Sequence, residues 1–250
     1  MIKRLFDISL SSILLLILLP FFLLIALIIF LYDFSNPIYS PNRVGKNDIE
    51  FIFIIFRSMT PDADISGIDS TSNNDTRITP IGSFIRKYKI DELSQIINVL
   101  LGDMSFVGPR PNVRRDVNLY SKEEKKLLSV KPGITDFSSI VFADEGDILE
   151  GHKDTDLIYN QLIRPWKSRL GIIYIENYSM SLDIKLLYLT ALSLISREKA
   201  LSQLCNILKK SSCLLTVTFS SKTIMEVFLF KGSILTQSFS VVKINWIFSS

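Results

Sequence analysis

The stretch "ISLSSILLLILLPFFLLIALIIFLY", Ile8 to Tyr32, decides much of the fold because it holds no charged side chain from end to end. About 20 apolar residues are enough for a helix to cross the hydrocarbon core of a bilayer. A cleaved signal peptide is a poor alternative, since the apolar part is too long and no small-residue cleavage site follows it. The sequence therefore predicts a membrane helix near the start of the chain.

The topology of this segment depends on Pro20, near its middle, and on the basic residues at its ends. A proline inside a helix removes one hydrogen bond and kinks or breaks the helix. Lys3 and Arg4 precede the segment and Arg43 and Lys46 follow it, so the preference of basic residues for the cytoplasm applies to both ends. A helix that enters, bends and returns satisfies that preference. A straight span is equally compatible with the residues, because large domains can cross a membrane regardless of nearby charge.

Composition fits one membrane anchor joined to a water-exposed domain. A hydrophobic content of 48% with a mean hydropathy of +0.31 is high for a wholly soluble protein, while 21% charged residues are too many for a polytopic membrane bundle. The net charge of +3 gives no strong case for nucleic acid, although it suits an anionic lipid surface or phosphorylated substrates. One His and two Cys without CxxC spacing support neither a zinc site nor a disulfide framework.

Beyond the anchor, hydrophobic spacing and turn residues predict short strands and amphipathic helices. The expected elements are strands at 38–40 and 50–59, loops at 41–48 and 60–80, rigid turns at 102–112 and 131–135, and helices at 81–89, 91–101, 120–130 and 164–199. The last range mixes Trp and Tyr with Lys and Arg, which fits helices at a membrane interface as well as an ordinary core pair. The final forty residues are strand-like in composition and differ from what precedes them.

An acidic pair, Asp91 and Glu92, stands at the expected start of the helix that Gly102 ends. Such a pair is commonly only a partner of the helix dipole. A carboxylate can also attack a phosphoryl group and form an acyl phosphate, and cations must then neutralise the developing charge. Glu92 beside such a nucleophile would suit Mg²⁺, which takes one or two carboxylates together with substrate phosphate oxygens.

Several cations near this pair in the sequence are candidates for binding substrate phosphate. Arg110 in "GPRP" lies between two prolines, which restrict its backbone and preorganise the guanidinium for bidentate phosphate binding. The further candidates are Arg77, Arg86 and Lys87.

Several motifs follow one another along the chain: the membrane segment, "RVGKN", "FRSM", "DTRITPIGSFIRK", "DELSQIINVLLGDMSFVGPRP", "KPGIT" and "ENYSMSLDIKLL". Together and in this order, they closely resemble the bacterial sugar transferases, the monotopic polyprenyl-phosphate phosphoglycosyl transferases. The match runs over about residues 1–195. The resemblance implies transfer of a sugar 1-phosphate from a nucleoside-diphosphate sugar, which we expect to be a UDP-sugar, to polyprenyl (undecaprenyl) phosphate. Release of the nucleoside monophosphate would accompany this step, which begins surface polysaccharide synthesis.

The resemblance also implies roles for single residues. Asp91 would be the nucleophile that takes the phosphosugar, and Glu92 together with Asp91 would form the Mg²⁺ site. Arg110 would bind phosphate. The implied re-entrant helix favours the bent topology over the straight span and keeps the catalytic domain on the cytoplasmic face of the bacterial inner membrane.

The resulting prediction is an α/β fold, mostly helical with a few short strands and with interfacial amphipathic helices. A re-entrant anchor is expected over residues 1–36, a catalytic domain over 37–200 and an atypical tail over 201–250. The expected partners are the nucleoside-diphosphate sugar, polyprenyl phosphate and the membrane, without nucleic acid; a homo-oligomer stays open.

Some positions depart from the family pattern, and alternatives follow. Leu19 precedes Pro20 where Ser is frequent, Ile55 replaces a common Lys, and Asp136 and Phe137 replace Gly-Trp after "KPGIT". In the acidic loop that follows, candidates for sugar choice are Asp144, Glu145 and Asp147, although a solvated loop is the simpler interpretation. Two alternatives stay open. One is an enzyme that transfers the sugar phosphate directly in a ternary complex, and the other is an inactive homologue that serves as a scaffold in a glycan assembly complex.

Overall fold

The computed structural model describes residues 2–63, 75–150 and 155–212. Residues 1–206 form one compact unit, and a second unit begins at Ile207. The composition change in the tail lies outside the described residues, as does most of the polar stretch 60–80. The predicted domain boundary near residue 36 stays a prediction, and the helix before it packs within the first unit.

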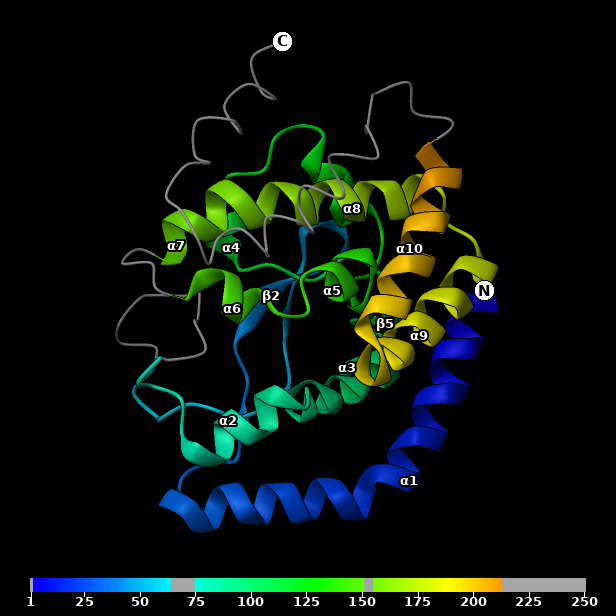
Figure 1. The fold of residues 1–250 in the computed structure, drawn as a ribbon. Helices are drawn as coiled ribbons and strands as arrows, with labels where there is room; N and C mark the ends of the chain where they lie inside the picture. The colour runs from blue at the N-terminus through cyan, green and yellow to red at the C-terminus, as the bar shows by residue number, and fades with distance from the viewer. Residues whose placement is uncertain (1, 64–74, 151–154, 213–250) are drawn as a thin grey trace. The chain divides into compact units, whose positions relative to one another are not determined.

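The described part of the chain is mostly helical, with a few short strands (Figure 1). The α-helices are α1 (Ile2–Asp33), α2 (Pro80–Lys87), α3 (Ile96–Leu101), α4 (Arg114–Val117), α5 (Phe137–Val141), α6 (Glu145–Leu149), α7 (Thr155–Ile158), α8 (Arg164–Glu176), α9 (Met180–Ile195) and α10 (Arg197–Ser212). The 3-10 helices are η1 (Lys46–Asp48), η3 (Ile90–Gln95) and η4 (Glu124–Ser129), and η5 (Tyr159–Ile163) is a π-helix. The strands are β1 (Ile38–Tyr39), β2 (Asn42–Val44), β3 (Glu50–Ile52), β4 (Ile55–Phe56), β5 (Ser105–Val107) and β6 (Gly133–Thr135).

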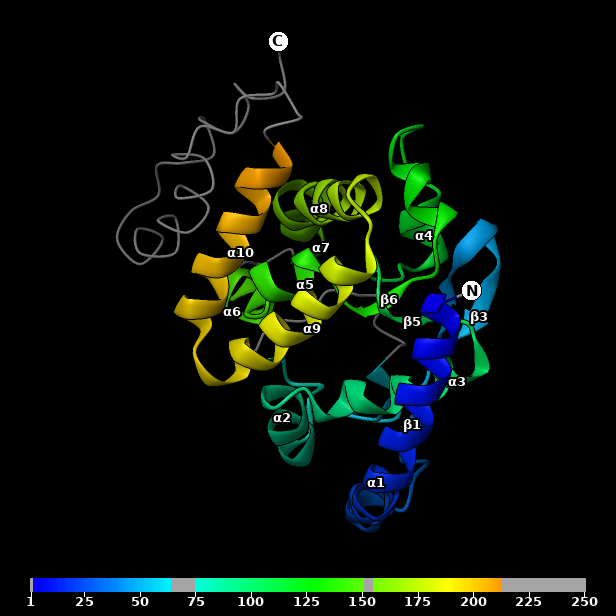
Figure 2. The same ribbon diagram turned by 90° about the vertical axis from the view of Figure 1, so that its right-hand side faces the viewer.

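The predicted apolar helix is confirmed as α1, which is long and apolar enough to cross a membrane. Pro20 lies inside it, and Figure 1 shows the helix with a pronounced bend. A proline inside a helix is the common cause of such a bend, because it cannot donate the usual hydrogen bond. Figures 1 and 2 both show α1 lying along the side of the unit that carries α3.

The residues of α1 on either side of Pro20 pack against the same compact unit. Before the proline, the rings of Phe6 and Phe106 lie 6.4 Å apart edge to face. After it, Phe22 meets Phe56 of β4 with ring centroids 5.5 Å apart. Many other large apolar side chains of α1 stay exposed in the protein alone, Leu16 at 76% among them. Such exposure on a long helix is typical of a lipid-facing surface.

The amino-terminal end of α1 is bonded to the core by its basic residues. The Lys3 ammonium donates to the Val107 carbonyl at 2.8 Å and pairs with the Asp183 carboxylate at 2.7 Å. Arg4 donates to the Val99 and Leu100 carbonyls at 2.6 and 2.8 Å. A cation at these carbonyls complements the carboxyl end of α3, where the last carbonyls lack helical partners.

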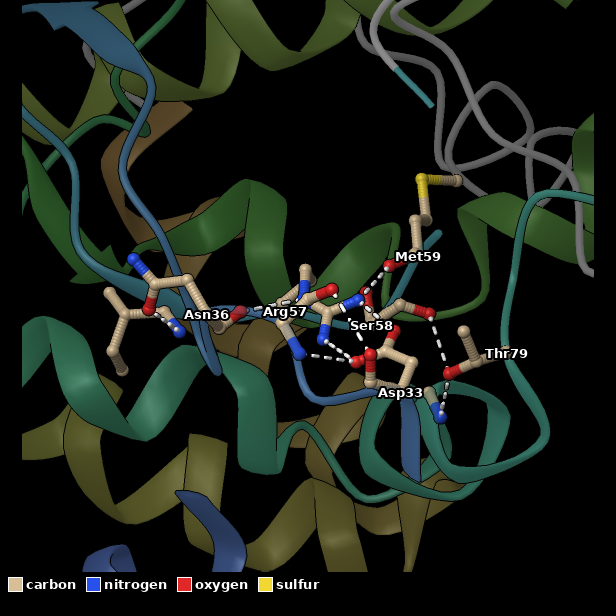
Figure 3. Close-up of polar contacts among 9 residues, drawn as sticks. Asp33, Asn36, Arg57, Ser58, Met59 and Thr79 are labelled. Carbon is tan, nitrogen blue, oxygen red and sulfur yellow. Dashed lines mark hydrogen bonds and ion pairs between the residues drawn. The ribbon is translucent and has the colours of Figure 1, made fainter. Parts of the chain in front are cut away.

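The carboxyl-terminal end of α1 is bonded to the same unit by Arg57 (Figure 3). The guanidinium forms two hydrogen bonds to the Asp33 carboxylate, at 2.6 and 2.7 Å, and its Nε donates to the Asn36 carbonyl at 2.7 Å. Arg57 is largely buried, so the planar bidentate geometry has little competition from water. Both ends of the bent helix are therefore fixed to one body of protein.

The strands are paired two by two within the described residues. Strands β1 and β4 are antiparallel, with Ile38 opposite Phe56, and β2 and β3 form a hairpin around η1. The predictions for 38–40 and 50–59 are thus confirmed in part. The predicted loop at 41–48 is wrong where β2 forms, because Arg43 pairs with Phe51 in a register that its short polar sequence does not reveal.

The two predicted rigid turns, 102–112 and 131–135, instead contain a parallel strand pair, β5 and β6. The backbones approach so closely that a Cβ on Gly133 would lie 2.1 Å from the Gly108 nitrogen. All three residues of β5 are buried, which positions the "GPRP" turn directly after a core strand. The glycines and prolines in these stretches led to the prediction of turns. In the structure, the glycines are needed because the two backbones approach each other closely.

We expect Gly133→Ala to lower the unfolding temperature of the protein in detergent by about 5 °C or more, because the added methyl group must push two backbones apart. Gly45→Ala is the matched control, since its Cβ would meet the movable Phe51 ring at 3.1 Å and the Ile49 carbonyl oxygen at 3.4 Å, an ordinary contact distance. Thermal unfolding followed by circular dichroism measures both changes. Equal unfolding temperatures for the two variants would contradict the packing argument.

The predicted helices are mostly present but differ in type and environment. The helix expected at 81–89 is confirmed as α2, and Gly102 ends α3 in the left-handed region with φ of 101°. The stretch 120–130 contains a 3-10 helix, η4. Within the proposed interfacial range, Tyr174 is 1% exposed and belongs to the core, whereas Tyr178 and Tyr188 are exposed.

Candidate active site

The acidic pair lies at a sharp turn between α2 and α3. The Thr79 hydroxyl caps α2 by accepting from the Gly82 amide at 2.9 Å. After α2, Lys89 adopts the left-handed region with φ of 56°, a conformation that non-glycine residues seldom hold. The chain then enters η3, whose first turn carries Asp91 and Glu92. The helix predicted to start at Asp91 thus begins as a tighter 3-10 helix.

The segment from η3 into α3 is fixed to the strands by buried polar side chains. Asn98 donates from its side chain to the Ile52 carbonyl at 2.7 Å and accepts from the Ile54 amide at 3.0 Å. The Ser94 hydroxyl donates to the Ile54 carbonyl at 3.2 Å. These contacts satisfy the hydrogen-bonding backbone groups between β3 and β4 and fix the segment that carries the acidic pair.

Glu92 and Arg110 form the central ion pair of the site. The two guanidinium Nη atoms donate to the two carboxylate oxygens at 2.8 and 3.1 Å. Burial alone would raise the pKa of Glu92, but Arg110 and Lys89 outweigh it and lower that pKa to about 2. Glu92 correspondingly raises the pKa of Arg110. The pair stays fully charged across the physiological pH range.

Asp91 has a different environment from its neighbour. Its Oδ1 atom is buried and has no hydrogen-bond partner in the described part of the chain. Burial, together with the Glu92 charge, raises the pKa of Asp91 to about 6, against the opposing influence of Arg86, Lys89 and Arg110. Asp91 is still mostly ionised at pH 7. Neighbouring carboxylates with pKa values pushed apart are a common arrangement in active sites.

The other predicted phosphate-binding cations differ in position. Arg86 is half-buried and within electrostatic range of Asp91. Arg77 is bonded to the Asp75 carboxylate, with the shortest N–O distance 2.7 Å. Lys87 is exposed, and its ammonium lies 5.7 Å from the centre of the Tyr88 ring. The structure therefore brings Asp91 and Arg110 together with Arg86, while Arg77 and Lys87 make other contacts.

The sequence interpretation did not include Lys167 of α8 and Tyr159 of η5. The Lys167 ammonium lies 5.2 Å from the Tyr159 ring centre and is paired with the Glu145 carboxylate. Lys167 contributes to the low pKa of Glu92. The signal in the sequence was Gly171, one helical turn after Lys167, which marks where α8 packs closely against the side chains of Leu127 and Pro109.

The donor atoms of the acidic pair fit a magnesium ion that is completed by substrate. No cluster of three or more His, Cys, Asp or Glu side chains suited to a metal occurs among the residues that the structure describes. Mg²⁺ is usually bound through only one or two protein carboxylates, with phosphate oxygens and water supplying the rest. The partnerless Oδ1 of Asp91 and the ionised Glu92 provide such a pair, because each Glu92 oxygen keeps a lone pair beside its hydrogen bond from Arg110.

Comparison with known proteins identifies relatives over most of this chain. The family model described as "Bacterial sugar transferase" matches residues 1–197. The exopolysaccharide production protein PSS of Rhizobium leguminosarum bv. phaseoli is 36% identical over 79% of this chain and 97% of that protein.

Two longer relatives carry names that specify a reaction. The undecaprenyl-phosphate glucose phosphotransferase of Komagataeibacter xylinus is 36% identical over 75% of this chain and 35% of that protein. The UDP-N-acetylgalactosamine-undecaprenyl-phosphate N-acetylgalactosaminephosphotransferase of Aeromonas hydrophila is 33% identical over 76% of this chain and 42% of that protein. The chain thus spans less than half of either protein. On the family match over residues 1–197, the chain belongs to the bacterial sugar transferase family.

Proposed function

We propose that this protein transfers a sugar 1-phosphate from a UDP-sugar to undecaprenyl phosphate and thereby begins the synthesis of a surface polysaccharide. The observation that carries the proposal is the buried, partnerless Oδ1 of Asp91 beside the Glu92–Arg110 ion pair. A carboxylate oxygen without a hydrogen-bond donor keeps its lone pairs available for attack on phosphorus. The names of relatives support the two substrates, since they specify undecaprenyl phosphate and, in the Aeromonas protein, a UDP-sugar.

In the proposed reaction, an Asp91 oxygen attacks the phosphorus that bears the sugar. A bond forms between that oxygen and phosphorus, and the bond to the bridging diphosphate oxygen breaks, which releases uridine monophosphate. A phosphate oxygen of undecaprenyl phosphate then attacks the same phosphorus. The bond to Asp91 breaks, the carboxylate is regenerated, and the sugar leaves as part of an undecaprenyl diphosphate product.

The surrounding residues reduce the cost of bringing anions together. Arg110 is fixed by two hydrogen bonds to Glu92, and the guanidinium has further N–H groups that can donate to phosphate oxygens. Arg86 and Lys89 lower the pKa of Asp91 and so favour the ionised nucleophile. Asp91 and Glu92 are the residues that would hold Mg²⁺. When bound, the ion would neutralise phosphate charge.

The direct test is a panel of UDP-sugars incubated with purified protein, undecaprenyl phosphate and Mg²⁺. We expect release of uridine monophosphate with at least one donor, and a radiolabelled sugar phosphate trapped on the protein when the acceptor is omitted. Release without any trapped adduct, together with sequential kinetics, would favour direct transfer in a ternary complex. An absence of release throughout the panel would favour the scaffold alternative.

We also propose that α1 is re-entrant and that the catalytic unit lies on the cytoplasmic face of the bacterial inner membrane. Asp33 at one end of α1 and Lys3 at the other are bonded to the same compact unit, which supports placing both ends on one side. The soluble donor is cytoplasmic, and the acceptor phosphate lies at the membrane surface.

Cysteine labelling in intact inverted membrane vesicles tests this topology. In a protein with Cys205 and Cys213 replaced by Ser, we expect Ile2→Cys and Asn47→Cys to react with a membrane-impermeant maleimide from the same, cytoplasmic side. Leu16→Cys is the control: its position is exposed in the protein alone but should be shielded by lipid. Labelling of residues 2 and 47 from opposite sides would disprove the re-entrant arrangement.

A further inference from the structure

A second cation lies beside the acidic pair, and its position follows from the packing of α8. A Cβ on Gly171 of α8 would lie 3.3 Å from the Cβ of Pro109, so the helix runs against the turn that carries Arg110. Lys167 lies four residues earlier, one turn along the same face of the helix. This places Lys167 on the face of α8 that packs against the "GPRP" turn.

The position of Lys167 is fixed by groups from two other elements. Glu145 of α6 supplies a carboxylate partner, and the Tyr159 ring supplies an aromatic face 5.2 Å from the ammonium. The exposed fraction of the Lys167 side chain is 15% and that of Glu145 is 29%. Tyr159 begins the π-helix η5, a form that occurs mostly as single turns and frequently at functional sites. A lysine enclosed in this way loses less conformational freedom when it binds a ligand than a solvated lysine does.

The charges of this group act on the acidic pair and its arginine. Lys167 is among the cations that lower the pKa of Glu92, and Glu145 and Tyr159 are among the groups that raise the pKa of Arg110. Lys167 also acts on the buried Asp136, which follows β6. The lysine is therefore within electrostatic reach of the site from the side of α8, whereas Arg86 and Lys89 act from the α2 side.

The acidic residues next to Glu145, Asp144 and Asp147, have other environments. Asp144 accepts from the Arg197 guanidinium, which also donates to the Val141 carbonyl. Asp147 is exposed. Glu145, one of the three acidic residues that the sequence suggested for sugar choice, is paired with Lys167 of α8.

We propose that Lys167 binds the diphosphate of the nucleotide-sugar donor, with Glu145 as its positioning residue. This inference rests on the proposed function. The ammonium has three N–H donors, so Lys167 can contact a phosphate oxygen while it stays bonded to Glu145. Its charge then stabilises the phosphate of the departing nucleoside monophosphate on the side opposite Arg86. The donor and not the lipid acceptor is the substrate whose binding depends on Lys167.

Steady-state kinetics with separate variation of the two substrates test this assignment. We expect Lys167→Met to raise the KM for the UDP-sugar about 10- to 100-fold and to leave the KM for undecaprenyl phosphate within about twofold. Lys167→Arg keeps the charge and should recover most of the loss. The matched control is Lys125→Met, an exposed lysine on η4, with no expected change in either KM.

The role of Glu145 is tested by Glu145→Gln, with Asp147→Asn on the same helix as control. We expect a rise of about 3- to 10-fold in the donor KM for Glu145→Gln, uniform across UDP-sugars, because the glutamine no longer fixes the ammonium. A larger effect than that of Lys167→Met, changing between sugars that differ in one hydroxyl group, would instead make Glu145 a reader of sugar hydroxyls and would overturn the assignment.

A binding measurement separates failure of this inference from failure of the proposed function. Isothermal titration of uridine monophosphate into detergent-solubilised protein should give weaker binding for Lys167→Met than for Lys125→Met. If the wild type binds the nucleotide and releases it from a donor while Lys167→Met behaves identically, the inference fails and the proposed function stands. If the wild type does neither, both fail.

Discussion

Asparagine in place of Asp91 is expected to leave the protein folded and to reduce the release of uridine monophosphate by about 10⁴-fold or more. The substitution keeps the shape of the side chain but replaces the anionic carboxylate by a neutral amide, which is a very weak nucleophile. No radiolabelled sugar phosphate should be trapped on the variant. A residual rate within about tenfold of the wild type, measured with the same donor, would show that Asp91 is not the nucleophile.

The same residue should determine the acid limb of the pH profile. Burial and the Glu92 charge raise the pKa of Asp91 to about 6, so the protonated, unreactive form predominates below that pH. With Mg²⁺ below saturation, we expect kcat/KM to fall about tenfold per pH unit below pH 6 and to be flat between pH 7 and 8; saturating Mg²⁺ should move the acid limb to lower pH, because a bound cation favours the ionised carboxylate. Glu92 contributes no inflection there, because its pKa is lowered to about 2.

The raised pKa also predicts how Asp91→Asn changes stability. The folded protein binds the Asp91 proton more tightly than the unfolded chain, whose carboxyl has a pKa near 3.8. Ionisation of Asp91 therefore lowers the free energy of unfolding as the pH rises from about 4 to 6. The free energy of unfolding stays lowered above pH 6. Asp91→Asn removes this effect, so the variant should be more stable than the wild type at pH 7 by about 1–3 kcal/mol. Denaturant unfolding at pH 5 and pH 7 measures this difference, and a less stable variant at pH 7 would contradict it.

Glutamine in place of Arg110 is expected to lower kcat/KM by about 10²- to 10³-fold. The change removes a cation from the proposed phosphate site and leaves the half-buried Glu92 carboxylate without its bidentate partner. Since Arg110 is among the groups that lower the pKa of Asp91, the acid limb of the pH profile should move to higher pH in the variant. A merely structural arginine would not move that limb.

Two further variants make the Arg110 experiment specific. Arg110→Lys restores the charge without the planar fork and should give an intermediate rate with a nearly normal acid limb. Arg114→Gln removes an arginine that is paired with Asp48 and Glu50 away from the acidic pair, and no change in kcat/KM beyond about twofold is expected. Equal losses for Arg110→Gln and Arg114→Gln would indicate a nonspecific effect of charge removal.

The sequence predicted the apolar helix because uninterrupted hydrophobicity is a local property, readable without knowledge of packing. The acidic pair and "GPRP" could also be located, and the structure places Glu92 against Arg110. The parallel pairing of β5 with β6 escaped prediction, since Gly108 and Gly133 serve contacts between segments far apart in the chain. For the same reason Lys167 was missed: its pairing with Glu145 depends on how α6 and α8 pack.

The pKa values of Asp91 and Glu92 are shifted in opposite directions, which the reference values of free side chains do not predict. Both carboxylates would be ionised with pKa values near 4 in an unfolded chain. The direction of each shift depends on distance to Arg110 and on burial, neither of which is written in the order of the residues. Sequence could name the pair, but only the folded geometry distinguishes their electrostatic environments.

The bonds at the amino-terminal end of α1 have a practical consequence for producing this protein. Arg4 supplies hydrogen-bond donors to the last turn of α3, and Asp7 accepts from the Phe106 amide of β5 at 3.2 Å. A shortened protein that starts after Asp33 would lose both contacts and expose the faces that α1 covers. The apolar helix α1 is thus part of the packed structure of the catalytic unit. A water-soluble form is better sought by polar substitution of the outward-facing leucines of α1 than by deletion of the helix.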